Sequence, residues 1–154
     1  MNQKPRLIDY ILLGLAVLCF LGMLIFVIVK YPSLPDTLPS HFNARGEIDG
    51  WSAKAAAAFF PSIVGFIMLV IIVPVSFFPK LWNNTQNIPA YKLPRVIRST
   101  RTGIYLLLVV MEGFFLYTSL CITRLAPMPP LAAHAFQALL GLCIVYILVQ
   151  TFRK

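Results

Sequence analysis

Two places in this sequence carry side chains that could do chemistry: a polar segment around His41 and one acid, Glu112, inside an apolar stretch. His41 could bind a metal or an anionic group, with a nearby carboxylate such as Asp49 as a second ligand. No cysteine or histidine follows His41 at a metal-ligand spacing. It could instead order its own loop through hydrogen bonds or contact a partner. A metal site shared with His134 is a further alternative, but we expect no cofactor and no metal.

Glu112 stands in the middle of its apolar stretch, where an ionisable side chain is costly and is by default a candidate for function. A helical rotation of about 100° per residue places Tyr105, Glu112 and Ser119 on one face. Arg101 and Thr123 extend this polar stripe at its two ends. Desolvation favours a neutral carboxyl there, because no basic residue of another stretch lies at that depth. The stripe could relay protons or ions, or Glu112 could donate an interhelical hydrogen bond that fixes packing.

The composition indicates what positions these residues. The chain has 154 residues, of which 59% are hydrophobic and 12% charged, and its mean hydropathy is +0.82. A soluble domain is about half apolar and a quarter charged. One core of this size cannot hide the excess, because about 30% of the chain surface would stay in water. The composition therefore excludes a soluble enzyme or a nucleic-acid-binding domain and predicts an integral membrane protein.

The fold that we predict is an all-α integral membrane protein made of one domain. Crossing a bilayer takes about 20 apolar residues. The predicted spans are residues 7–29, 55–78, 103–122 and 131–152. An ordered extracytoplasmic cap, residues 30–54, joins the first two spans, and a basic cytoplasmic loop, residues 79–102, joins the second and third.

The basic residues set the predicted orientation. The formal net charge is +8, and nine of the 13 basic residues lie on one side if both termini are cytoplasmic. The loop 79–102 contains no acid, and Arg95, Arg98 and Arg101 recur in it every three residues. This cluster suits anionic lipid headgroups or a cytoplasmic regulator, or it serves topology alone. Aromatic residues do not alternate with the basic ones, so we expect no nucleic-acid partner.

The cap 30–54 carries more turn chemistry than a simple linker needs. Its prolines favour an extended path in the first half. Asn43–Gly46 and Asp49-Gly50 are turn signals, and His41-Phe42 could pair with Glu47-Ile48 in a small hairpin. The candidate residues for contact with a ligand or partner are His41, Phe42, Asn43, Gly46, Asp49, Gly50 and Trp51.

This loop resembles a known family. The residues that carry the resemblance are Leu34-Pro35-Asp36-Thr37-Leu38-Pro39-Ser40-His41-Phe42-Asn43, then Gly46, Asp49-Gly50-Trp51 and Lys54. They are similar to the signature of the SdpI-like immunity proteins, in which the signature marks an N-terminal membrane module of unknown function. The resemblance implies a multi-pass protein of the bacterial cytoplasmic membrane. It also implies immunity to, or sensing of, a secreted membrane-active peptide toxin.

The function that we expect is therefore non-enzymatic binding, immunity or sensing through the cap. The sequence has no phosphate-binding loop, no zinc-protease helix motif and no nucleophile elbow. The alternative is a proton- or ion-coupled transport module that uses Glu112. The expected partners are membrane lipid, a secreted peptide toxin and, because small residues punctuate the spans, a second copy of the chain.

Overall fold

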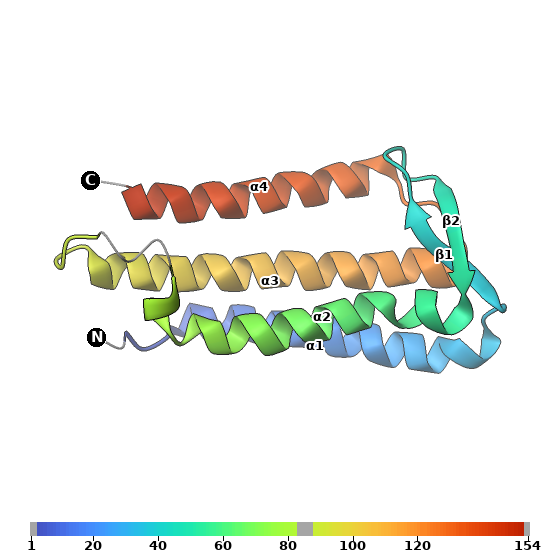
Figure 1. The fold of residues 1–154 in the computed structure, drawn as a ribbon, viewed down its shortest axis with the longest axis horizontal. Helices are drawn as coiled ribbons and strands as arrows, with labels where there is room; N and C mark the ends of the chain where they lie inside the picture. The colour runs from blue at the N-terminus through green and yellow to red at the C-terminus, as the bar shows by residue number, and fades with distance from the viewer. Residues whose placement is uncertain (1–2, 83–87, 153–154) are drawn as a thin grey trace.

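The structure, a computed structural model, describes residues 3–82 and 88–152 of the chain. These residues form four long helices, each of them long and apolar enough to cross a membrane, and one β-hairpin (Figure 1). The elements are α1 (Leu7–Lys30), β1 (Thr37–Phe42), β2 (Ile48–Ala53), α2 (Lys54–Ser76), α3 (Leu93–Arg124) and α4 (Pro130–Phe152), with 3₁₀ turns at Tyr31–Ser33 and Pro79–Leu81. The predicted fold class is confirmed, with the small sheet as its non-helical part.

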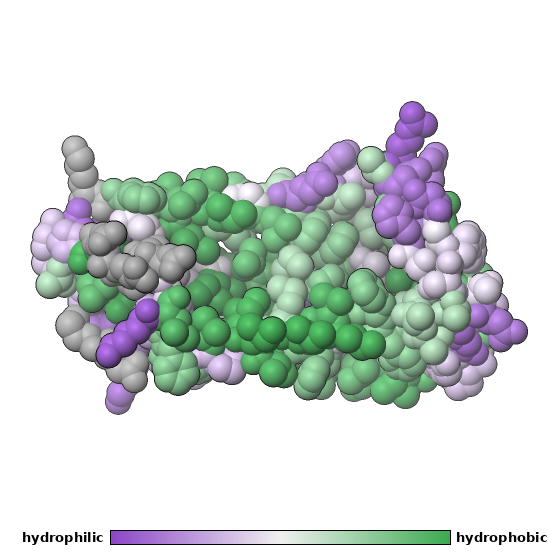
Figure 2. Space-filling model, in the orientation of Figure 1, coloured by the Kyte–Doolittle hydropathy of each residue, from purple (hydrophilic) through white to green (hydrophobic). Residues whose placement is uncertain are grey.

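The helices lie side by side and alternate in direction along the chain (Figure 1). Helices α1, α2 and α3 pack together, whereas α4 packs mainly on α3. Apolar side chains cover the long sides of the molecule, and polar ones gather at the hairpin end (Figure 2). This distribution is the one that a bilayer requires, and the chain is a multi-pass membrane protein.

The prediction for the third span and the loop before it was wrong at one boundary. Helix α3 begins at Leu93, so residues 93–102 are helical and not part of a loop. Residues 83–87 of the predicted loop lie outside the described residues. Hydropathy detects where an apolar stretch begins, but Pro94 is suited to the first turn of a helix, and Val96 and Ile97 are buried. The helix therefore extends beyond its apolar part.

The interior holds two apolar clusters with a polar layer between them. The cluster near the hairpin contains Val27, Leu34, Leu38, Ala57, Ala58 and Ile122. The cluster toward the other end contains Leu12, Ala16, Tyr105 and Leu108. Ser62 and Gly65 of α2 and Glu112 of α3 are buried and lie along their helices between these clusters. Ser62 and Glu112 therefore have an apolar cluster on each side of them along the bundle.

The β-hairpin closes one end of the bundle (Figure 1). Its base is fixed to α2, since the Lys54 amide donates to the Asp36 carbonyl at 2.8 Å and Leu38 is fully buried. Its tip reaches the connection between α3 and α4, where the Met128 amide donates to the Gly46 carbonyl at 2.8 Å. The hairpin thus links the α1–α2 side of the bundle to the α3–α4 side.

Candidate functional site

The hairpin turn is built by Asn43. Its side-chain Oδ1 accepts hydrogen bonds from the backbone amides of Arg45, at 2.8 Å, and Glu47, at 3.0 Å. Its Nδ2 donates to the Glu47 carboxylate at 2.8 Å. Gly46 supplies the left-handed backbone at φ +77°, and its amide donates to the Asn43 carbonyl. Asn43 and Gly46 thus hold the turn in one shape.

Gly46 also lets the hairpin tip approach the rest of the protein. A Cβ atom added at this residue would lie 1.6 Å from the Met128 carbonyl oxygen, a distance that no side chain tolerates. Gly50 makes a similar approach within the hairpin, since its added Cβ would lie 2.8 Å from the Cβ of His41. Both glycines are therefore required by space, and Gly46 by its backbone conformation as well.

His41 and Asp49 form a polar pair on the hairpin. The strands pair Pro39 with Trp51 and His41 with Gly50, and Phe42 then pairs with Ile48, so the register is irregular on both sides of His41. Such bulges redirect side chains. His41 Nδ1 lies 2.5 Å from Asp49 Oδ1, with 69% and 43% of the two side chains exposed.

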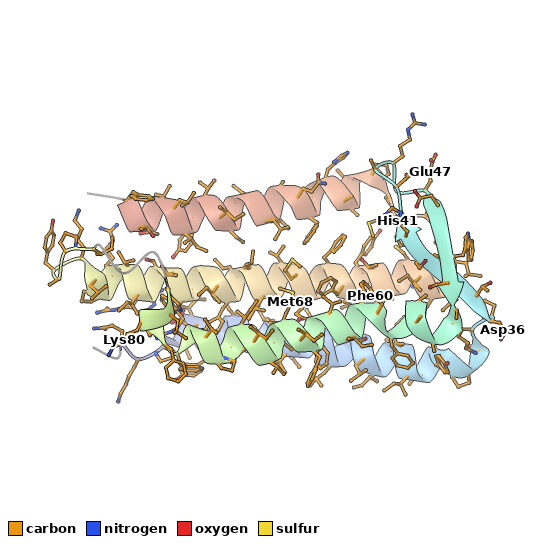
Figure 3. The ribbon with its side chains drawn as sticks, in the orientation of Figure 1. Asp36, His41, Glu47, Phe60, Met68 and Lys80 are labelled. Carbon is orange, nitrogen blue, oxygen red and sulfur yellow. The ribbon has the colours of Figure 1, made fainter. Side chains whose placement is uncertain are left out.

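The predicted contact residues divide into two groups. Asn43, Gly46 and Gly50 shape the hairpin, and Phe42 packs partly buried against the apolar cluster beneath it. His41, Asp49 and Trp51 are exposed, with Trp51 at 55%. Figure 3 shows His41 and Glu47 near the hairpin tip, beside the start of α4, and Asp36 at the opposite end of the hairpin. We refer to the exposed group, His41, Asp49 and Trp51, as the exposed hairpin surface.

Glu112 is fully buried against the backbone of α2. A Cβ atom at Gly65 would lie 2.6 Å from Glu112 Oε2 and 3.1 Å from Oε1, so the carboxyl group occupies the space that this glycine leaves open. Among the described residues, neither carboxyl oxygen has a hydrogen-bond partner, and neither do the buried hydroxyls of Ser62 and Ser119. Burial of a carboxylate without hydrogen-bond partners is costly, and within the described residues these polar atoms make no hydrogen bond that stabilises the fold.

The rest of the predicted polar stripe has partners of its own. The Tyr105 hydroxyl lies 2.6 Å from the Ser76 hydroxyl, which also donates to the Val73 carbonyl. Arg101 is 1% exposed, and it donates to the carbonyls of Ser76, at 3.1 Å, and Gln3, at 2.6 Å. A headgroup-binding role for Arg101 is therefore wrong, because its guanidinium satisfies carbonyls at the end of α2 and before α1.

Sequence reasoning missed a second buried acid, Asp9. Its carboxylate accepts hydrogen bonds from the Arg6 amide, at 2.7 Å, and from the Thr102 hydroxyl. The Arg6 guanidinium donates to the same hydroxyl at 2.5 Å. An acid three residues after a helix cap is a known signal, because it can bond back to the cap amide. The network joins the start of α1 to α3 and stabilises that end of the bundle.

The structure brings together no metal-ligand set at the predicted histidines. Within residues 3–82 and 88–152, no group of three or more histidine, cysteine or acidic side chains could hold a metal ion. His134 is exposed on the first turns of α4. The pairing that His41 does make is with a carboxylate.

Membrane-length helices capped by an ordered β-hairpin define a multi-pass membrane protein with an extramembrane cap. Residues 17–66 match a membrane-associated family described as a domain of unknown function (DUF1648). The matched segment runs from α1 through the hairpin into α2 and ends one residue after Gly65. Comparisons with curated proteins and with solved structures give no match.

Proposed function

We propose that this chain is a non-enzymatic binding module of the SdpI-like immunity type in the bacterial cytoplasmic membrane. The hairpin end faces the extracytoplasmic side in this proposal, with both termini in the cytoplasm. The ligand is a secreted, membrane-active peptide, and the module serves immunity or sensing. The observation that carries the proposal is a hairpin that is fixed at its base and tip while the exposed hairpin surface, His41, Asp49 and Trp51, stays open to contact.

The geometry supports binding for two reasons. A hairpin that is already ordered loses little conformational entropy when a partner binds, which improves affinity. Trp51 offers a large exposed aromatic surface, and tryptophan is among the residue types enriched at positions that dominate binding energy. An amphipathic peptide lies in the plane of the membrane surface, at the level of such a cap. In the proposed orientation, the hairpin would meet such a peptide at the membrane surface.

The proposal is tested by survival of a sensitive bacterium that expresses the chain and is challenged with membrane-active peptides. Trp51→Ala should reduce protection by about 30-fold, since a dominant contact contributes 2 kcal/mol or more. Phe60→Ala is the matched control, because Phe60 is another exposed aromatic side chain, 63% exposed, but lies on α2 outside the hairpin. Equal loss of protection in both variants, at equal expression, would contradict recognition by the hairpin.

A second candidate function rests on a different observation. The Glu112 carboxyl and the Ser62 and Ser119 hydroxyls are buried in the membrane part without partners among the described residues. Such a layer could pass a proton, and ionisable residues at membrane depth mark relays in pumps and transporters. Purified protein in vesicles with a pH-sensitive dye should then dissipate a pH gradient. Glu112→Gln should abolish this flux, whereas Thr118→Ala, which alters a hydroxyl bonded to its own helix, should not.

A further inference from the structure

The end of the molecule opposite the hairpin contains a cleft of about 510 Å³. It lies between the first turns of α3 and the last turns of α4, with the start of the chain at one edge. The side chains that line it are Arg6, Tyr91, Pro94, Arg95, Arg98, Ser99, Tyr146 and Gln150. Among the residues that the structure describes, this lining consists of arginines, a proline and neutral polar or aromatic residues, and none of them is a carboxylate.

Most of this positive charge is uncompensated. Arg6 lies near a carboxylate, with its Nε 3.9 Å from Asp9 Oδ2. The Arg95 guanidinium donates only to the neutral Gln150 side chain, at 3.3 Å, as far as the described residues extend. Arg98 is exposed, and within the same residues its guanidinium has no hydrogen-bond or ion-pair partner. Within the described residues, these two guanidinium groups therefore lack an anionic partner.

The cleft lies at the depth of lipid headgroups. Gly103 of α3 packs directly against Ile147 and Tyr146 of α4, where the apolar part of α3 begins. Gln150 follows Pro130, the first residue of α4, by 20 residues, which correspond to about 30 Å of helix. That length equals the thickness of the hydrocarbon core, about 30 Å. If α4 enters the hydrocarbon core at Pro130, Gln150 and the cleft beside it reach the level of the lipid phosphates on the other side.

We propose that this cleft binds the headgroup phosphate of an anionic phospholipid, with Arg95 and Arg98 as the principal donors. Guanidinium groups bind phosphate oxygens through paired hydrogen bonds. The described lining residues offer no carboxylate to receive the ammonium group of a zwitterionic lipid, so the cleft selects a net negative headgroup such as phosphatidylglycerol. The exposed apolar residues Val145, Leu148 and Val149 give the acyl chains a path along α4.

The test measures lipid binding to the purified full chain in neutral detergent by native mass spectrometry. Phosphatidylglycerol should bind more tightly than phosphatidylcholine. Arg98→Gln should weaken binding about fivefold, and Arg95→Gln with Arg98→Gln about 30-fold. Lys80→Gln is the matched control, because it removes an exposed positive charge at the same end without altering the cleft. It should leave the affinity unchanged.

Three results would overturn the proposal. Lys80→Gln could weaken binding as much as Arg98→Gln, which would indicate general charge attraction. Phosphatidylcholine could bind as tightly as phosphatidylglycerol. Inorganic phosphate alone could bind as tightly as the lipid, which would assign the cleft to a soluble anion. Arg98→Gln makes the test robust to misfolding, since this exposed side chain makes no hydrogen bond or ion pair within the described residues, and helical content by circular dichroism verifies the fold.

Discussion

The contact between Gly65 and Glu112 makes a quantitative prediction for Gly65→Ala. The added Cβ would lie 2.6 Å from Glu112 Oε2 and 3.2 Å from Cδ, so the carboxyl group must move. Glutamate has a flexible end, but this one is fully buried. Overpacking of a buried site costs about 1–3 kcal/mol. Alanine also favours helix over glycine by up to about 1 kcal/mol, so the net destabilisation should be about 0–2 kcal/mol.

The two effects separate when Gly65→Ala is made in two Glu112 backgrounds. In Glu112→Ala the clashing group is absent, so Gly65→Ala should be neutral or stabilising by up to about 1 kcal/mol. The helix-propensity gain is common to both backgrounds and cancels in the coupling energy, which should be about 1–3 kcal/mol. Glu112→Gln is the matched control, because it keeps the volume of the side chain. A steric penalty should persist in it, whereas an electrostatic one should disappear.

The assay is the free energy of unfolding of the purified protein in mixed micelles, followed by circular dichroism as a denaturing detergent is added. Each variant is compared at equal protein and lipid concentration. The reasoning would be refuted if Gly65→Ala had the same effect in the native, Glu112→Ala and Glu112→Gln backgrounds. That result would mean that the glycine and the carboxyl group are energetically independent.

Three further changes test other contacts of the fold. Gly46→Ala should destabilise the protein by about 3 kcal/mol or more, because it forces a left-handed alanine into the Met128 carbonyl, whereas Gly14→Ala, with open space around it, should be neutral or stabilising in the same unfolding assay. Asn43→Ala removes three hydrogen bonds and should increase amide hydrogen exchange in the hairpin, with the helices unaffected. Asp9→Ala leaves its buried donors unpaired and should lower the free energy of unfolding by about 2–4 kcal/mol; a loss below 0.5 kcal/mol would contradict the buried network.

The helical part of the fold was predictable because apolar length is read directly from the sequence. The ends of α1, α2 and α4 agree with the predicted spans to within two residues. The start of α3 was not predictable in this way, since Leu93–Thr102 is a polar helical segment held by tertiary contacts such as those of Arg101. A hydropathy profile detects only residues apolar enough to lie in the bilayer. The contacts that hold the first turns of α3 involve polar residues before the apolar stretch, so the profile does not detect them.

In the candidate site, too, local features were predictable from the sequence, whereas features that depend on tertiary contacts were not. The turn chemistry of Asn43 and Gly46 is local, so the sequence predicts an ordered cap. The exposed pair of His41 and Asp49 depends on an irregular register that no short motif encodes. The space at Gly65 that holds the Glu112 carboxyl depends on how two helices approach, which residue spacing on a single helix does not reveal.

The tightest contacts of the matched segment reach beyond its own boundary. Within residues 17–66, Gly46 is docked on Met128 and Gly65 on Glu112, and both of these partners come later in the chain. In this chain the segment therefore completes its packing with residues that follow it. During synthesis Gly46 emerges 82 residues before Met128, the residue on which the hairpin tip rests, so the tip can dock only after α3 has been made. An isolated fragment of residues 17–66 would lack Met128 and Glu112, so Gly46 and Gly65 would lose the groups that pack against them.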